Sequence, residues 1–199
     1  GEMRRQAKII NFGMQYGMGV SALQKNLNTN REEAQRYYNE YFKQFSGLER
    51  YMRDVKAETA KRGYTETFFG RRRYFEGISS RLPHIKAQAE RMAINAPIQG
   101  TQADIVKIAM SRVDAFLTKT GYAHDAHLLL QVHDELVYEI KKEAVKILIP
   151  EIKKIMEGVL SLKEMKGVPL LVDVVMGKTW GSMKKINKTL VVSKDLGPK

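Results

Sequence analysis

The chain has 199 residues, a net charge of +12 and no cysteine, which is enough length for one domain with a core or for two small lobes. The lack of cysteine excludes disulfides, thiolate zinc sites and cysteine nucleophiles. The four histidines of the chain have no paired ligand spacing, which argues against a zinc site. No apolar run reaches the roughly 18 residues of a membrane span. The charge favours a polyanionic partner, nucleic acid before an anionic membrane, but a soluble intracellular protein with a merely cationic surface would carry the same charge.

The first segment, "RRQAKIINFGMQYG", predicts a helix with one distinctive face. Arg4, Lys8, Phe12 and Tyr16 lie four residues apart, so a helix brings them into one slowly drifting stripe. Gly17 then offers a stop.

Helical patterns continue through the next forty-odd residues. A short helix is expected over 21–28, and Thr29 or Asn30 is expected to cap the helix that follows. Aromatic and apolar residues keep helical spacing as far as Lys61, which predicts one helix ended by Gly63.

The middle of the chain changes from a hairpin pattern to a long helix. Alternating threonines and aromatics around Gly70 predict a short hairpin, and Pro83 is expected to open a helix over 84–120. Within that helix, Pro97 and Gly100 are expected to cause a bend or an interruption.

The last third combines strands with one more helix. Two short apolar runs in "HLLLQVHDELVYEI" predict a β-hairpin. An amphipathic helix is predicted over 141–160, and "VPLLVDVVMG" predicts a final strand. Helices followed by a hairpin, a helix and a strand indicate an α+β fold, with an antiparallel sheet backed by helices and a helical lobe on one side.

Two groups of residues could carry chemistry. Apolar strands hold His133, Asp134 and Glu135 at a turn, where a carboxylate can bind a hard cation such as Mg2+, although aspartate is common in solvated turns. In the opening stripe, the cations Arg4 and Lys8 could bind phosphates and the rings could pack against a base or sugar. The alternative is an amphipathic helix with a basic solvated edge and two core aromatics.

Four segments together resemble a known family. "RRQAKIINFGMQYG" resembles motif B of the family A DNA polymerases and "QVHDELVYE" resembles motif C. Between them, "TFFGRRRYF" and "ERMAINAPIQGTQADIVKIAM" are also similar to the family, in the same order and spacing. The similarity extends from about Glu2 to Trp180.

The resemblance implies a nucleotide site on the opening helix. It assigns Arg4 and Lys8 to the triphosphate of the incoming deoxynucleotide, Phe12 to its sugar and base, and Tyr16 to the templating position. The catalytic residues it implies are Asp134, Glu135 and Lys8, with Asp134 as a ligand of catalytic Mg2+.

The resemblance also implies contacts with primer–template DNA. It assigns Arg91, Asn95, Gln99 and His133 to that role. The residues alone leave alternatives open: Asn95 could cap a broken helix, Gln99 could bond the backbone near Pro97, and the arginines 71–73 could be a phosphate-facing loop or a solvated charge run.

By the same resemblance, residues 1–82 are the fingers-like helical portion with the short hairpin, 83–184 the palm portion with the metal-binding hairpin, and 185–199 a tail. No "DYSQIELR"-like motif A, which carries the second metal-binding aspartate, occurs in the sequence. We therefore expect these residues to be inactive alone and to need an upstream polymerase half carrying motif A. The expected setting is cytoplasmic and nucleoid-associated, in replication or repair, without a membrane.

Two other functions share these features. A non-catalytic DNA-binding module derived from a polymerase would keep the fold and the charge. A single-subunit RNA polymerase would share the palm, although the "FGMQYG" pattern is more similar to the DNA-polymerising branch.

Overall fold

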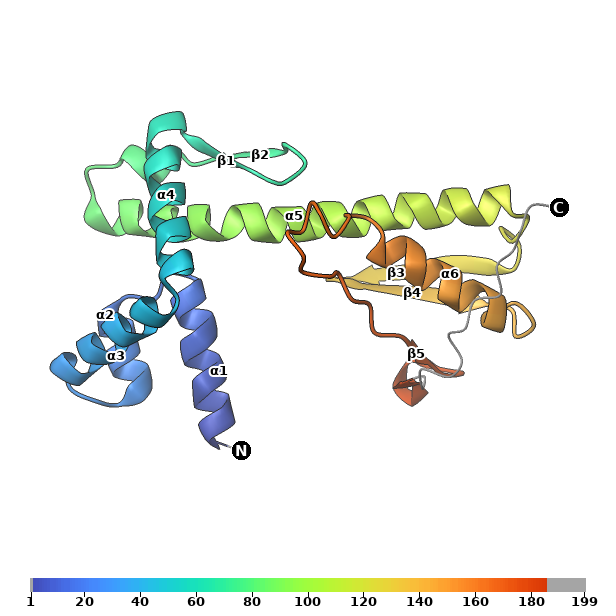
Figure 1. The fold of residues 1–199 in the computed structure, drawn as a ribbon, viewed down its shortest axis with the longest axis horizontal. Helices are drawn as coiled ribbons and strands as arrows, with labels where there is room; N and C mark the ends of the chain where they lie inside the picture. Colours follow the sequence, from blue (N-terminus) through green and yellow to red (C-terminus); the bar gives the residue numbers. More distant parts are fainter. Residues whose placement is uncertain (1, 186–199) are drawn as a thin grey trace. The chain divides into compact units, whose positions relative to one another are not determined.

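A computed structural model describes residues 2–185, and its side chains other than those of Glu2 and Gln6. The chain divides into two compact units, with the boundary between Thr101 and Gln102. The fold is α+β, as the sequence predicts, with helices and small two-stranded antiparallel sheets (Figure 1). The predicted division into fingers and palm at residue 82/83 is a functional one and stays a prediction.

The first unit contains four helices and a hairpin, followed by the first half of a long helix. The helices are α1 (Glu2–Gln15), α2 (Val20–Leu27), α3 (Arg31–Gln44), α4 (Ser46–Arg62) and the start of α5 (Pro83–Lys119). The strands β1 (Tyr64–Glu66) and β2 (Arg72–Tyr74) pair antiparallel, and a 3-10 turn, η1 (Glu76–Ser79), leads to α5.

Local signals place most of these boundaries where the sequence predicts them. Asn30 caps α3, because its side chain accepts a hydrogen bond of 2.8 Å from the Glu33 amide. Gly63 ends α4 in the left-handed conformation that glycine adopts without strain.

The predicted single helix up to Lys61 is wrong, because it breaks at Phe45. Phe45 has φ −108° and ψ 50°, which is outside the helical region, and it separates α3 from α4. The break turns the chain so that Phe42 and Met52, on either side of it, enter the same core. Tertiary packing has overridden a continuous helical pattern.

Of the predicted bend or interruption of the long helix, the interruption is wrong, since α5 runs through Pro97 and Gly100. Proline removes one backbone N–H there, but the next turns remain helical. The hydroxyl of Thr101 donates to the Pro97 carbonyl at 2.6 Å. This bond does not replace the lost one, because the carbonyl that lacks its helical donor is that of Ala93, four residues before the proline.

One apolar cluster holds the helices of the first unit together. It contains buried residues from all five helices, namely Met14, Leu23, Phe42, Met52 and Ile94. These side chains fix one face of α1, which leaves its opposite face at the surface.

The backbone conformation and the close packing after the end of α1 both favour glycine at position 17. Gly17 has φ +79°, and a Cβ there would lie 3.3 Å from both Arg91 Cγ and Ile94 Cδ1 on α5. We expect Gly17→Ala to destabilise the chain by about 1–2 kcal/mol, since other residues are strained in this conformation. Urea unfolding followed by circular dichroism measures the change.

Gly47→Ala is the matched control. Gly47 lies in α4 with nothing within 4 Å of an added Cβ, so alanine there should be neutral or slightly stabilising. Equal destabilisation by both substitutions would contradict the packing argument.

The second unit contains the rest of α5, the hairpin of β3 (Ala126–Val132) and β4 (Glu135–Ile140), and α6 (Val145–Glu157). A core cluster joins all three parts through Val113, Leu117, Ala126, Leu148 and Ile152. The hairpin thus has α5 and α6 behind one face, which is the helix-backed arrangement that the sequence predicts. The helix predicted over 141–160 is shorter, because turns occupy residues 142–144.

The predicted strand over 168–177 is mostly absent. Residues 168–174 form no strand, and only β5 (Val175–Met176) pairs, with β6 (Lys184–Lys185). A strand needs a hydrogen-bonding neighbour along its length, and the described residues offer none along residues 168–174. Lys185, the first residue of the predicted tail, pairs in β6, and the rest of the tail, 186–199, lies outside the described residues.

Tyr138 is the titratable group most affected by the core of the second unit. Burial, with a smaller effect of the Asp114 charge, raises the pKa of Tyr138 to about 12. The unfolded chain loses this proton near pH 10, so the stability that Tyr138 contributes is complete below pH 10 and is lost as the pH rises through about 12. Tyr138→Phe should therefore move the alkaline unfolding midpoint, measured by circular dichroism, to higher pH, and an unchanged midpoint would contradict this.

Candidate nucleotide and metal sites

The predicted stripe of α1 is exposed, and three of its side chains lie one after another along the helix. The Lys8 ammonium lies 5.6 Å from the centroid of the Phe12 ring, and the Phe12 and Tyr16 rings are nearly parallel with centroids 6.4 Å apart. Arg4, one turn before Lys8, is also exposed and makes no ion pair with another described residue.

The aromatic residues of this stripe are not core residues. Phe12 is 45% exposed and Tyr16 43% exposed, so the alternative with two core aromatics is wrong. The buried face of α1 is instead fixed by Met14, and the Tyr41 hydroxyl donates to Asn11 Oδ1 at 2.7 Å. That hydrogen bond joins α1 to α3, and no signal in the sequence predicted it.

Three predicted DNA-binding residues follow one face of α5. Arg91, Asn95 and Gln99 lie four residues apart on the helix. The Asn95 side-chain oxygen is buried and has no hydrogen-bond partner in the described part of the chain. Because buried acceptors are normally satisfied, this atom fits a donor from outside the chain or a bound water.

The alternatives for two of these residues find no support. Asn95 does not cap a broken helix, since α5 is continuous there. At Pro97 it is Thr101, not Gln99, that bonds the backbone carbonyl.

The β1–β2 hairpin is held against α5 by two hydrogen bonds. The Phe68 amide donates to Thr101 Oγ1 at 2.9 Å, and Arg71 Nη2 donates to the Gly100 carbonyl at 3.0 Å. A Cβ at Gly100 would lie 2.5 Å from Thr67 Cγ2, so this close approach requires glycine.

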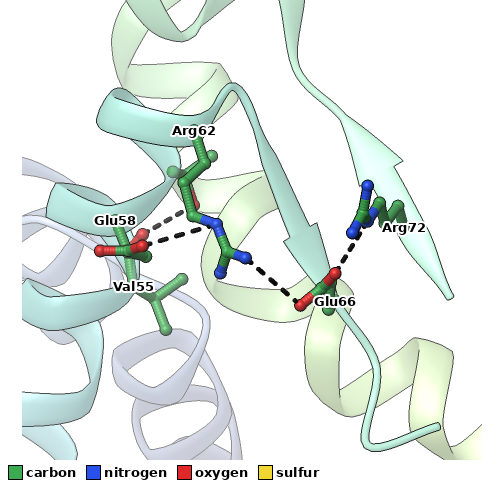
Figure 2. Close-up of polar contacts among 6 residues, drawn as sticks. Val55, Glu58, Arg62, Glu66 and Arg72 are labelled. Carbon is green, nitrogen blue, oxygen red and sulfur yellow. Dashed lines mark hydrogen bonds and ion pairs between the residues drawn. The ribbon is translucent and has the colours of Figure 1, made fainter. Parts of the chain in front are cut away.

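The three arginines of this hairpin are not equivalent. Figure 2 shows a chain of ion pairs from Glu58 through Arg62 and Glu66 to Arg72, with Arg72 Nε 2.8 Å from Glu66 Oε1. The Arg72 guanidinium also lies 4.6 Å from the Tyr64 ring centroid. Arg72 therefore makes its contacts within the unit. For residues 71–73 as a whole, this favours neither of the two alternatives, a phosphate-facing loop or a solvated charge run.

The β3–β4 hairpin holds the predicted metal ligand at its tip. Val132 pairs with Glu135, so His133 and Asp134 form a two-residue connection, and Glu135 begins β4. His133 has φ +53°, the left-handed conformation that such tight hairpin turns require, and its carbonyl accepts a hydrogen bond of 2.6 Å from Gln131 Nε2. Nothing in the sequence signalled this backbone conformation.

The tip fits Mg2+ only as part of a ligand set. The side chains of Asp134 and Glu135 are exposed and make no hydrogen bond or ion pair with other described residues, and carboxylate oxygens are the ligands that Mg2+ prefers. Across residues 2–185, no group of three or more His, Cys, Asp or Glu side chains could hold a metal ion. Further ligands would have to come from a substrate, water or another segment.

These two exposed arrangements, a cationic aromatic helix and an acidic hairpin tip, belong to different units. A family profile, DNA polymerase family A, matches residues 1–182. The chain belongs to this family. Family A polymerases use divalent metal ions, which agrees with the oxygen ligands at the hairpin tip.

Within residues 2–185, no helix is long and apolar enough to cross a membrane.

Individual relatives agree with the family. The chain is 44% identical to DNA polymerase I of Pseudomonas aeruginosa over 180 residues, which is 90% of this chain and 19% of that protein. It is 43% identical to the thermostable DNA polymerase I of Thermus aquaticus over 183 residues, 92% of this chain and 21% of that protein. The chain thus spans about a fifth of the length of these family A relatives.

A solved structure supports the same fold. The POL domain of Pol1 from M. smegmatis, in complex with a DNA primer-template and dNTP, matches with a TM-score of 0.78 and 38% sequence identity. The match covers 85% of this chain and 29% of that one. The chain is accordingly similar to part of a polymerase domain.

Proposed function

We propose that these residues form part of the active site of a template-directed DNA polymerase, which adds deoxynucleotides to the 3′ end of a primer. The observation that carries the proposal is the exposed stripe of Lys8, Phe12 and Tyr16 on α1, the other face of which packs in the core. The similarity to a polymerase domain bound to primer-template and dNTP supports it.

The roles of the α1 residues follow from their chemistry. Arg4 and Lys8 would bind the triphosphate with charge-assisted hydrogen bonds and orient its α-phosphorus toward the primer. As the primer 3′ oxygen forms its bond to that phosphorus, the bond to pyrophosphate breaks, and the same cations would stabilise the charge on the leaving group. Phe12 would pack against the nucleotide, and Tyr16 would lie at the templating position.

Asp134 would hold catalytic Mg2+ with Glu135 beside it, together with carboxylates from a segment carrying motif A. The bound metal would supply activation of the 3′ oxygen and neutralisation of charge on the phosphates. In the palm portion, His133 would lie at the primer end.

DNA binding would use shape and charge rather than base sequence. Asn95 and Gln99 can meet groove acceptors that all base pairs share, and Arg91 can meet phosphate. Because the chain carries a net charge of +12, DNA affinity should fall steeply with salt.

Primer extension tests the proposal. The 199-residue chain alone should give no extension, and the chain combined with an upstream polymerase half carrying motif A should extend the primer. Extension by the chain alone would contradict the need for a second carboxylate segment. A folded assembly that binds DNA but never extends the primer would favour a non-catalytic DNA-binding module.

Phe12→Tyr tests the placement of the nucleotide sugar. By the family resemblance, the added hydroxyl lies near the 3′ position of the nucleotide and compensates for a missing 3′ hydroxyl. One hydrogen bond of this kind should raise the dideoxy-to-deoxy incorporation ratio by roughly tenfold. Competitive primer extension by the assembled polymerase measures the ratio, and an unchanged value would show that Phe12 lies elsewhere.

A further inference from the structure

A pocket of about 650 Å³ opens between α1, α2 and α3 of the first unit. Its apolar lining consists of Ile10 and Leu27, which are partly exposed, and of Met14 and Leu23, which are fully buried. This volume is within the range of about 300–1,000 Å³ that is usual for small-molecule sites.

The pocket lies away from the proposed nucleotide site, although both involve α1. Ile10 and Met14 each follow a stripe residue, Lys8 or Phe12, by two positions. Two residues correspond to about 200° around a helix, so the pocket and the stripe occupy opposite faces of α1. An occupant of the pocket would therefore not compete directly for the nucleotide stripe.

The rim of the pocket is acidic and phenolic. One face of α3 provides most of it, with Glu33, Tyr37, Glu40 and Tyr41. None of the described residues that line the pocket is a lysine or arginine, although the chain has 34 of these residues against 22 acidic ones. The lining is thus opposite in charge to the protein as a whole.

The two acidic residues of the rim differ in availability. Glu33 accepts a hydrogen bond from the Thr29 hydroxyl and lies 3.9 Å from Arg36, which is outside the lining. Glu40 is exposed and makes no hydrogen bond or ion pair within the described residues. Glu40 is therefore the carboxylate that remains open to a ligand.

We propose that this pocket binds a small organic cation, namely a primary ammonium group attached to an apolar body about the size of a phenylalkyl chain. The apolar body would cover Ile10 and Leu27, which are partly exposed, and this adds burial without leaving a polar group unpaired. The ammonium would reach Glu40 and the face of a tyrosine ring, both of which attract cations. The site does not depend on the proposed polymerase function.

Binding of 4-phenylbutylammonium to the 199-residue chain, followed by amide NMR, tests the proposal. Saturable shifts should be confined to residues that line the pocket, and 4-phenylbutyrate, which has a similar body and the opposite charge, should bind at least about tenfold more weakly. Equal binding of the two compounds, or shifts centred on another part of the chain, would overturn the proposal.

Charge variants of the rim separate a specific contact from general attraction. Glu40→Gln should weaken binding of the ammonium compound about three- to tenfold, whereas Glu32→Gln, the same change on α3 outside the pocket, should leave it unchanged. Glu40→Lys should reverse the preference in favour of 4-phenylbutyrate. Equal effects of Glu40→Gln and Glu32→Gln, or no reversal in a Glu40→Lys variant with wild-type circular dichroism, would contradict the proposed site.

Discussion

Replacing Asp134 with alanine is expected to abolish DNA synthesis by the assembled polymerase while leaving most of its DNA affinity. Asp134 is exposed at the tip of the β3–β4 hairpin, and its side chain makes no hydrogen bond or ion pair with a described residue, so the fold should persist. Loss of a ligand of the catalytic metal removes charge stabilisation at the reacting phosphate and should lower kcat by on the order of a thousandfold. Single-turnover primer extension and a DNA-binding titration measure the two effects separately.

Glu139→Gln is the matched control for this prediction. Glu139 is an exposed carboxylate on β4, opposite His127 and away from the turn, so its loss should leave the rate within about twofold. If Asp134→Ala retained near wild-type synthesis, Asp134 would not be a metal ligand. If it lost DNA binding in proportion to synthesis, its role would be in DNA binding.

Replacing Lys8 with alanine is expected to lower kcat/KM for the incoming deoxynucleotide roughly 10- to 100-fold. The exposed ammonium stands over Phe12 and forms no ion pair with a described residue, so it is available to a triphosphate. A charge-assisted hydrogen bond contributes about 1.5–3 kcal/mol, which corresponds to that range. Steady-state kinetics with one nucleotide varied measures the loss, and DNA affinity should change little.

Lys25→Ala provides the comparison, because Lys25 is an exposed cation on α2 outside the α1 stripe. It should reduce only the general attraction for polyanions, by well under tenfold. Similar losses for both lysines would mean that the effect is one of net charge rather than of triphosphate binding.

Short-range sequence signals predicted much of the fold. Asn30 as a cap, Gly63 as a stop and the hairpin around Gly70 each depend on a few neighbouring residues, and all three occur in the structure. The stripe of α1 was predictable for the same reason, since four-residue spacing on a helix fixes which side chains share a face.

Features that depend on distant residues were not predictable in this way. The break at Phe45 follows from the need of α3 and α4 to share a core with α1, which periodicity does not register. The continuity of α5 at Pro97 is not registered by the proline signal, which considers only the neighbouring residues. The strand pattern after Val168 predicts a strand but not a neighbour to pair with, and most of that segment forms none.

The candidate site shows the same division. The sequence identified Lys8, Phe12 and Asp134 by residue type and motif, and the structure adds that all three are exposed and available. The sequence could not show that Arg72 contacts Glu66 and Tyr64, because these contacts depend on the hairpin register. Nor could the sequence reveal the acidic pocket between α1, α2 and α3, because three helices together form it.

The most direct test of the central claim is a structure of the assembled polymerase with primer-template, a matched deoxynucleoside triphosphate and Mg2+. We expect the Arg4 and Lys8 side chains at about 2.7–3.2 Å from oxygens of the triphosphate, and the Asp134 carboxylate at about 2.0–2.1 Å from a Mg2+ ion that the same triphosphate also binds. A triphosphate bound away from α1, or an Asp134 carboxylate with no metal and no approach to that nucleotide, would contradict the account.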